Sequence, residues 1–149
     1  MWGVRDKGYG PTITNTMGCL CTKYDWDTTE TLNFEGKITR AKVVSVYDGD
    51  TVKVTFPYMG KMFRWNCRLN GVDTPEIRTR DPLGKIEGLA ARDALRKKIL
   101  HKVVVVTCGK FDKYGRLLVD INTDGVSITE WLISNDLGVA YDGGTKNRV

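Results

Sequence analysis

The chain has 149 residues, of which 41% are hydrophobic and 28% are charged, and its formal net charge is +5. This length suits one domain with a tail, and the composition is that of an ordinary globular protein in water. The longest apolar run, Val103–Val106, is too short for a membrane span. The single histidine, His101, disfavours both a Ser-His-Asp hydrolase and a nuclease with a histidine base. The net positive charge suits a polyanionic partner such as nucleic acid, although many soluble domains are mildly basic.

The N-terminal part of the chain has no hydrophobic periodicity. We expect residues 1–35 to form a poorly ordered tail and residues 36–149 to form the folded domain. The first ten residues include Arg5, Asp6 and Lys7 and lack the apolar centre of a signal peptide. The sequence therefore predicts an intracellular, cytoplasmic protein with reduced cysteines.

A short N-terminal motif offers an alternative location. Residues 17–22 fit the myristoylation pattern Met-Gly-x-x-x-Ser/Thr if translation starts at Met17, and then Gly18 would carry the acyl chain. Palmitoylation of Cys19 and Cys21 would add a second anchor, and two acyl chains can hold a protein at a membrane. Because the given sequence starts at Met1, Gly18 is internal and we favour two free cysteines. Peripheral membrane attachment stays an alternative.

Patterned sequence starts near Gly36 and predicts three strands. Lys37–Val46 alternates loosely, Thr51–Phe56 alternates strictly between apolar and polar side chains, and Met62–Leu69 is the third apolar stretch. Asp48-Gly49, between the first two, is a tight-turn signal. Links this short join antiparallel neighbours, so we expect a three-stranded meander.

Two helices are predicted in the second half of the chain. After a polar loop over Asp73–Glu87, Gly88–Leu100 reads as a helix because Ala91, Leu95 and Ile99 recur at a spacing of four. The second helix begins at a capping box, in which a serine is followed three residues later by a glutamate. That box is Ser127–Glu130.

Two further strands complete the predicted architecture. Val103–Cys108 has the apolar run of a buried strand, and Leu117, Val119 and Ile121 alternate in a fifth. The resulting order is β-β-β-α-β-β-α. We therefore predict a mainly β, α+β protein: a five-stranded Greek-key barrel of the OB type with two packed helices.

Two carboxylates are predicted to meet at the strand ends. Asp50 follows the tight turn and begins a strand, while Asp73 follows the end of another. Carboxylates bind hard cations such as Ca²⁺ or Mg²⁺, and these ligands would also accept Mn²⁺. Thr74 is held extended by Pro75 and can offer its carbonyl as a third oxygen. Either motif alone is better read as an ordinary turn or loop entry.

Three more charged residues complete the chemistry of phosphodiester cleavage. Glu76, two residues beyond Thr74, can orient an attacking water or accept its proton. Arg68 and Arg116 lie in apolar surroundings typical of strands, which can aim their guanidinium forks at phosphate oxygens. Each residue alone is usually an ordinary surface charge. The complete set predicts a metal-dependent nuclease.

Four segments, in this order along the chain, resemble the signature segments of the staphylococcal nuclease (thermonuclease) family. They are Asp48–Lys53, Arg68–Glu76, Asp112–Arg116 and Val139–Tyr141, and the resemblance covers residues 38–141. Each fragment is weakly specific, whereas the ordered set is strongly specific. The resemblance implies a Ca²⁺-dependent phosphodiesterase with an OB barrel that cleaves DNA and RNA. Water attack would leave 3′-phosphate and 5′-hydroxyl ends.

The resemblance also implies a role for each matching residue. The metal ligands would be Asp50, Asp73 and Thr74; the catalytic residues Arg68, Glu76 and Arg116; and the contacts to the terminal phosphate and nucleotide Lys113, Tyr114 and Tyr141. Asp142-Gly143-Gly144 follows Tyr141 where the family has a second tyrosine, which affects the details of the nucleotide pocket.

One alternative function stays open, namely a non-catalytic nucleic-acid-binding module on the same barrel. The complete set of carboxylates and arginines favours the enzyme, because carboxylates that face a polyanion would only weaken a pure binder. We expect a monomer. The preference for DNA or RNA and the choice between endonucleolytic and exonucleolytic cleavage are left open by the sequence.

Overall fold

A computed structural model describes residues 23–143. The chain divides into two units, Met1–Leu32 and Asn33–Val149, and all the strands and helices described below belong to the second. The candidate lipidation residues Gly18, Cys19 and Cys21 lie outside the described residues. No helix within residues 23–143 is long and apolar enough to cross a membrane.

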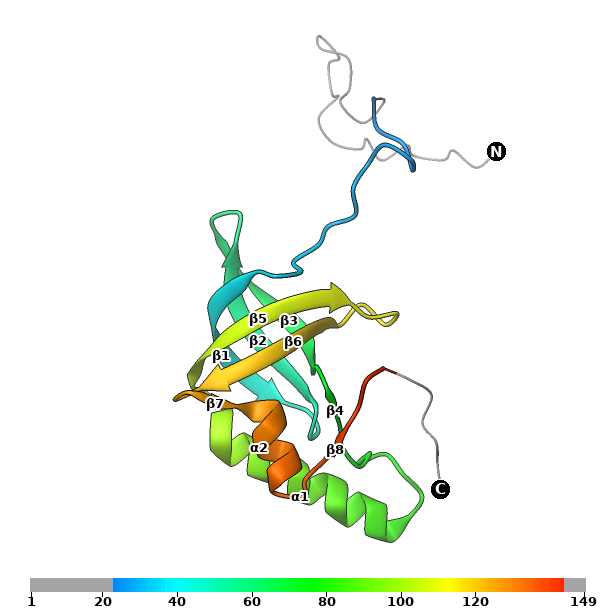
Figure 1. The fold of residues 1–149 in the computed structure, drawn as a ribbon, viewed down its shortest axis with the longest axis vertical. Coiled ribbons are helices and arrows are strands. Elements are labelled where there is room, and N and C mark those ends of the chain that lie inside the picture. The colour runs from blue at the N-terminus through cyan, green and yellow to red at the C-terminus, as the bar shows by residue number, and fades with distance from the viewer. Residues whose placement is uncertain (1–22, 144–149) are drawn as a thin grey trace, which may run out of the picture. The chain divides into compact units, whose positions relative to one another are not determined.

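Five long strands form a closed barrel (Figure 1). β1, β2 and β3 form the predicted antiparallel meander, and β5 pairs antiparallel with both β1 and β6. A parallel pairing of β3 with β6 closes the ring. The predicted five-stranded barrel of the OB type is thereby confirmed. The strands are β1 (Ile38–Val46), β2 (Thr51–Tyr58), β3 (Lys61–Leu69), β5 (Val103–Phe111) and β6 (Leu117–Thr123).

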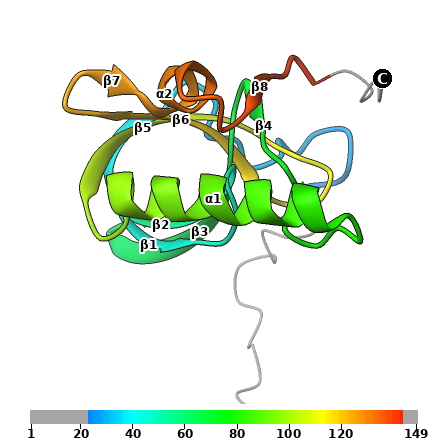
Figure 2. The same ribbon diagram turned by 90° about the horizontal axis from the view of Figure 1, so that it is seen from below.

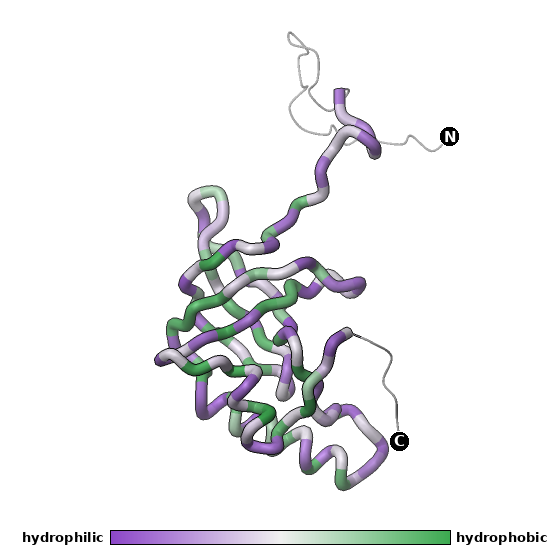
Figure 3. The backbone as a smooth tube through the Cα atoms, in the orientation of Figure 1, coloured by the Kyte–Doolittle hydropathy of each residue, from purple (hydrophilic) through white to green (hydrophobic). Residues whose placement is uncertain are grey.

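The alternation of side chains explains why these segments form a barrel. Along β2, Val52, Val54 and Phe56 are fully buried, while the residues between them are partly exposed. Buried and more exposed positions alternate in the same way along β5 and β6, although the exposed positions of β5 include Val103 and Val105. Figure 3 shows hydrophobic residues along the barrel strands. Phe34 also packs in this core, with its ring 5.0 Å from that of Trp65. The barrel interior is therefore a continuous apolar core that fixes the strand ends.

Two buried cysteines belong to this core. Cys67 and Cys108 are free thiols. Burial, with a smaller contribution from the nearby Cys108, raises the pKa of Cys67 to about 12. Both cysteines act as small apolar residues here, and Cys67 stays a protonated thiol at neutral pH.

The first helix, α1 (Pro82–Ile99), lies across one end of the barrel (Figure 2). It begins at Pro82 and not at the predicted Gly88, so the expected polar loop is shorter. Asp81 caps the helix, because its carboxylate accepts hydrogen bonds from the backbone N–H groups of Leu83 and Gly84. Leu83 is exposed, as is Ile86, so these first turns carry no buried stripe that sequence periodicity could detect.

The second helix and three short strands complete the domain. Helix α2 (Ile128–Ser134) begins at the predicted capping box, where the Ser127 hydroxyl accepts a hydrogen bond from the Glu130 backbone N–H. The short strands are β4 (Val72–Asp73), β7 (Val126–Ser127) and β8 (Val139–Ala140). β4 pairs antiparallel with β8, which connects the segment after β3 to the segment after α2.

Gly88 lets α1 approach the chain that follows β4. A Cβ atom at this position would lie 2.6 Å from the Pro75 carbonyl oxygen and 3.2 Å from the Glu76 carbonyl carbon. Both neighbours are backbone atoms and cannot rotate away. Because Gly88 has no side chain, α1 can pack directly against the Pro75–Glu76 backbone.

We expect Gly88→Ala to lower the free energy of unfolding by roughly 1–3 kcal/mol, because the added methyl group overpacks α1 against this backbone. Denaturant unfolding measures the change. Gly84→Ala is the comparison in the same helix, since its added methyl group would meet the capping carboxylate of Asp81 at 3.0 Å and no backbone atom, so any loss there reports on the cap alone. Equal stability of Gly88→Ala and the wild-type protein would contradict this packing role.

Candidate active site

Arg68 joins the two predicted metal-ligating aspartates. Its Nη1 lies 2.6 Å from Asp50 Oδ2, and its Nη2 lies 3.1 Å from Asp73 Oδ1. Asp50 immediately precedes β2, Arg68 lies near the end of β3, and Asp73 lies in β4. Because β2 and β3 pair with Thr51 opposite Arg68, the turn before β2 is held beside the end of β3. Both carboxylates therefore face the same guanidinium.

Gly49 holds the Asp50 turn against Thr74. A Cβ atom at Gly49 would lie 2.6 Å from Thr74 Oγ1 and 2.8 Å from Thr74 Cβ. Only a residue without a side chain permits this approach. Asp50 and Thr74 are both buried, with 4% and 5% of their surface exposed. The Asp-Gly-Asp sequence is thus more than a turn signal, because its glycine brings the turn into contact with the Thr74 segment.

The buried position of Asp50 changes its ionisation. The pKa of Asp50 is raised to about 6, chiefly because the carboxylate is buried; the nearby charge of Arg68 limits this rise, and the carboxylate of Asp48 contributes to it. For Arg68, burial lowers the pKa, but the charges and hydrogen bonds of Asp50 and Asp73 outweigh it and raise the pKa above its ordinary value. Arg68 therefore stays charged and balances part of the negative charge around it.

Arg116 is held by a carboxylate of its own. Asp112 Oδ2 accepts a hydrogen bond of 2.8 Å from Arg116 Nε, and Asp112 Oδ1 accepts one of 2.9 Å from the Arg116 backbone N–H. Burial raises the pKa of Asp112, but these hydrogen bonds, one from the Tyr114 backbone and the Arg116 charge lower it below its ordinary value. The native ion pair therefore stabilises the fold above the ordinary aspartate pKa and loses this effect as the pH falls through the lowered value.

Thr51 connects the two arginines. Its hydroxyl donates a hydrogen bond of 3.0 Å to Asp50 Oδ1 and accepts one of 3.4 Å from Arg116 Nη1. A continuous network thus runs from Asp112 through Arg116, Thr51 and Asp50 to Arg68. Sequence reasoning did not single out Thr51 or assign a role to Asp112. The spacing of four between Asp112 and Arg116 across a Gly115 turn was the available signal for that pair.

The predicted nucleotide contacts surround these arginines. The Arg116 guanidinium carbon lies 5.5 Å from the centre of the Tyr114 ring, and Lys113 Nζ lies 5.1 Å from the same centre. On the other side, the Arg68 guanidinium carbon lies 5.8 Å from the centre of the Tyr141 ring. The β4–β8 pair holds Tyr141 in place, because its backbone N–H donates to the Gly71 carbonyl at 3.0 Å.

All nine residues predicted for metal, catalysis and substrate line one cleft of about 740 Å³. The cleft also includes Arg78, which the sequence marks equally as a possible substrate contact or as part of a solvated basic loop. Its other lining residues were not assigned to the site from sequence: Tyr47, Asp48, Thr51, Pro75, Ile77, Asp112, Leu118 and Gly143. The structure thus brings together four segments that lie far apart in the sequence. It gives the predicted set a common surface on which a single substrate could lie.

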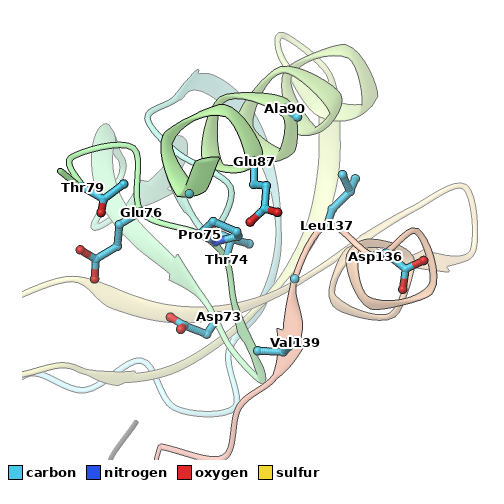
Figure 4. Close-up of a pocket in the computed structure, with 12 residues that line it drawn as sticks. Asp73, Thr74, Pro75, Glu76, Thr79, Glu87, Ala90, Asp136, Leu137 and Val139 are labelled. Carbon is cyan, nitrogen blue, oxygen red and sulfur yellow. The ribbon is translucent and has the colours of Figure 1, made fainter. Parts of the chain in front are cut away.

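A smaller cavity of about 610 Å³ adjoins this cleft and shares the segment Asp73–Glu76 with it. Figure 4 shows the carboxylates of Asp73 and Glu76 pointing to the same side, away from Leu137 and Asp136. Glu87 extends from α1 over the smaller cavity. The two carboxylates of the predicted site are thus directed differently from the other acidic residues nearby.

The donor atoms of the cleft suit a hard divalent cation. No group of three or more histidine, cysteine or carboxylate side chains within residues 23–143 is arranged to hold a metal. The arrangement here is different: the carboxylates of Asp50 and Asp73 meet at one guanidinium, and the backbone of Thr74 follows directly. Oxygen donors of this kind suit hard cations such as Ca²⁺ or Mg²⁺, whose remaining positions are filled by water or substrate oxygens.

Comparison with known proteins agrees with this geometry. The family described as staphylococcal nuclease homologues matches residues 66–148, which is more than half of the chain. The chain belongs to this family, as the sequence resemblance predicted. The matched region includes Arg68, Asp73, Glu76 and Arg116 and begins after Asp50.

Individual relatives are more distant. An uncharacterized protein of Methanocaldococcus jannaschii is 36% identical over 100 residues, covering 54% of this chain and 46% of the relative. Proteins of Escherichia coli and Escherichia coli O157:H7, each named an uncharacterized endonuclease, are 28% identical over 102 residues, covering 68% of this chain and 60% of the relative. The chain thus spans about half the length of the curated relatives it matches.

Proposed function

We propose that the protein is a Ca²⁺-dependent nuclease that hydrolyses phosphodiester bonds of DNA or RNA. Water attack leaves 3′-phosphate and 5′-hydroxyl ends in this proposal. The observation that supports it most directly is the single cleft lined by all nine predicted residues. Membership of the staphylococcal nuclease family and the relatives named as endonucleases support the same class of activity.

In the proposed reaction, the two arginines bind the scissile phosphate. Arg116 is oriented by Asp112, and its Nη1 already reaches the Thr51 hydroxyl inside the cleft. Arg68 enters the cleft from β3 with its guanidinium between two carboxylates. Such preorganised donors stabilise the negative charge that grows on the non-bridging oxygens as the phosphorus is attacked. Glu76 orients the attacking water and takes its proton.

Asp50, Asp73 and the Thr74 carbonyl are the residues that would hold the cation. When bound, the cation would neutralise the carboxylates and part of the phosphate charge. Without the cation, Arg68 is the positive group paired with these carboxylates. Lys113, Tyr114 and Tyr141 bind the adjoining phosphate and nucleotide in this proposal. The exposed ring of Tyr114 and the partly buried ring of Tyr141 suit bases, and the positive charge of Lys113 suits a phosphate.

Cleavage of single-stranded DNA tests this function. We expect cleavage with added Ca²⁺ and none with excess chelator, and activity should return when Ca²⁺ is restored. Parallel assays with Mg²⁺ and Mn²⁺ identify the cation that supports turnover, and end-group analysis identifies the products. Cleavage that persists in chelator, or products with 5′-phosphate ends, would contradict the proposed mechanism.

The alternative is a nucleic-acid-binding module without catalysis. It predicts that the protein binds single-stranded DNA but leaves it intact with any of the three cations. The network that orients Arg116 and the carboxylates that line the cleft favour the enzyme, because acidic groups that face a polyanion oppose its binding. Binding measured by fluorescence anisotropy beside the cleavage assay separates the two functions.

A further inference from the structure

The cleft contains an aromatic and basic pair that the proposed reaction does not use. The Arg78 guanidinium carbon lies 5.6 Å from the centre of the Tyr47 ring, and both residues line the cleft. Tyr47 has 46% of its surface exposed, so its ring is accessible. Tyr47 directly follows β1, and Arg78 lies in the segment between Glu76 and α1. Two separate segments thus place these side chains together at the cleft.

Strand pairing shows where this pair lies relative to the catalytic centre. The Tyr47 backbone N–H donates to the Thr51 carbonyl at 2.9 Å, Thr51 lies opposite Arg68 on β3, and Arg68 lies opposite Leu118 on β6. Tyr47 is therefore on one side of the Thr51–Arg68 pair, and β6, which follows Arg116, is on the other. The path from β1 through β2 and β3 to β6 crosses three strand spacings, an arc of roughly 14 Å along the wall of the closed barrel.

The two ends of the cleft have the same chemistry. At the β6 end, Lys113 and Arg116 lie over the exposed ring of Tyr114. At the β1 end, Arg78 lies over the exposed ring of Tyr47. Proteins that bind single-stranded nucleic acid combine aromatic rings, on which bases stack, with positive charges that follow the backbone, and OB barrels bind about 4–16 nucleotides in this way. A nucleic-acid strand that crosses the cleft at Arg68 would therefore reach both ends.

We propose that Tyr47 and Arg78 form a second nucleotide subsite. It binds the nucleotide on the opposite side of the scissile phosphate from Tyr114, with its base on the Tyr47 ring and its phosphate at Arg78. This subsite rests on the proposed nuclease function for its place in the reaction. Its ligand class is single-stranded nucleic acid of any sequence, because every base offers a flat face to a tyrosine.

An end-labelled DNA oligonucleotide with one abasic position tests the subsite, because product lengths give a cleavage rate at each bond. In the wild-type protein, we expect cleavage to slow about tenfold at the bond that places the missing base against Tyr47. Cleavage should also be slow at a second bond, the one that places the missing base against Tyr114 or Tyr141. In Tyr47→Ala, the first effect should disappear and the second should stay. An unchanged pattern in Tyr47→Ala would overturn the proposal.

Further variants separate stacking from charge and from misfolding. Tyr47→Phe keeps the ring and should keep the wild-type pattern, whereas Arg78→Ala should raise the KM for the oligonucleotide about tenfold. Arg80→Ala is the matched control, since Arg80 is exposed in the same loop and does not line the cleft. Equal effects of Arg78→Ala and Arg80→Ala would show a general charge effect and would overturn the assignment of Arg78.

Binding in chelator distinguishes failure of the subsite from failure of the nuclease function. With the intact oligonucleotide, we expect Tyr47→Ala to raise the Kd measured by anisotropy about tenfold, whether or not the protein cleaves DNA. If the wild-type protein binds the oligonucleotide but does not cleave it, and Tyr47→Ala weakens binding, the proposed nuclease function is wrong and the subsite stands. If the wild-type protein cleaves DNA but Tyr47→Ala changes neither the Kd nor the cleavage pattern, the subsite alone is wrong.

Discussion

Glu76→Gln is expected to lower kcat for single-stranded DNA by about 10²–10⁴-fold, which is the usual contribution of a positioned general base. The amide keeps the size of the side chain and can still hydrogen-bond a water, but it cannot take the proton. DNA binding should stay within about twofold of the wild-type value, or become slightly tighter, because the variant removes a negative charge that faces a polyanion. Initial cleavage rates and anisotropy titrations measure the two effects separately.

Glu87→Gln is the matched control for this experiment. Glu87 projects from α1 over the smaller cavity, whereas the Glu76 carboxylate is directed with that of Asp73 (Figure 4). The same change of charge close by, but outside the main cleft, should leave kcat unchanged. If Glu76→Gln retained near-normal turnover, or if both variants lost the same amount, Glu76 would not be the base.

The barrel could be predicted from the sequence because its signals are local. The alternation in β2 and the turn at Asp48-Gly49 each act within a few residues, and together they specify the meander. The start of α1 could not be predicted in this way. Its first turns expose Leu83 and Ile86, so the only signals were the capping residue Asp81 and the proline after it.

The candidate site shows the same division between local and long-range information. Family motifs pointed to Asp50, Arg68 and Asp73 individually, and their proposed roles stay predictions. Their mutual arrangement depends on pairing between β2 and β3 and on the close packing of Gly49 against Thr74. Tyr47 belongs to no motif, and Arg78 stood out only as one of several charges in a basic loop. Their contact joins two segments whose proximity only the folded chain establishes.

Arg116→Lys is expected to lower kcat by about 10²–10³-fold, although it preserves the positive charge. Lysine can still pair with Asp112, since a single N–H···O contact satisfies that carboxylate. It cannot do so and also present the remaining donors of a planar fork to a phosphate. In the structure, Arg116 Nε binds Asp112 while Nη1 points to Thr51 inside the cleft. The loss should therefore appear in kcat with little change in KM.

Arg92→Lys is the matched control, because Arg92 is also paired with an aspartate, at 2.8 Å from Asp93, but lies on α1 outside the cleft. Its activity and thermal stability should match those of the wild-type protein. If Arg116→Lys kept turnover within about threefold of the wild-type value, positive charge alone would suffice and the bidentate role of the guanidinium would be wrong. A large loss in Arg116→Lys with normal stability would show that the Asp112–Arg116 pair orients a donor for catalysis, beyond any contribution it makes to the fold.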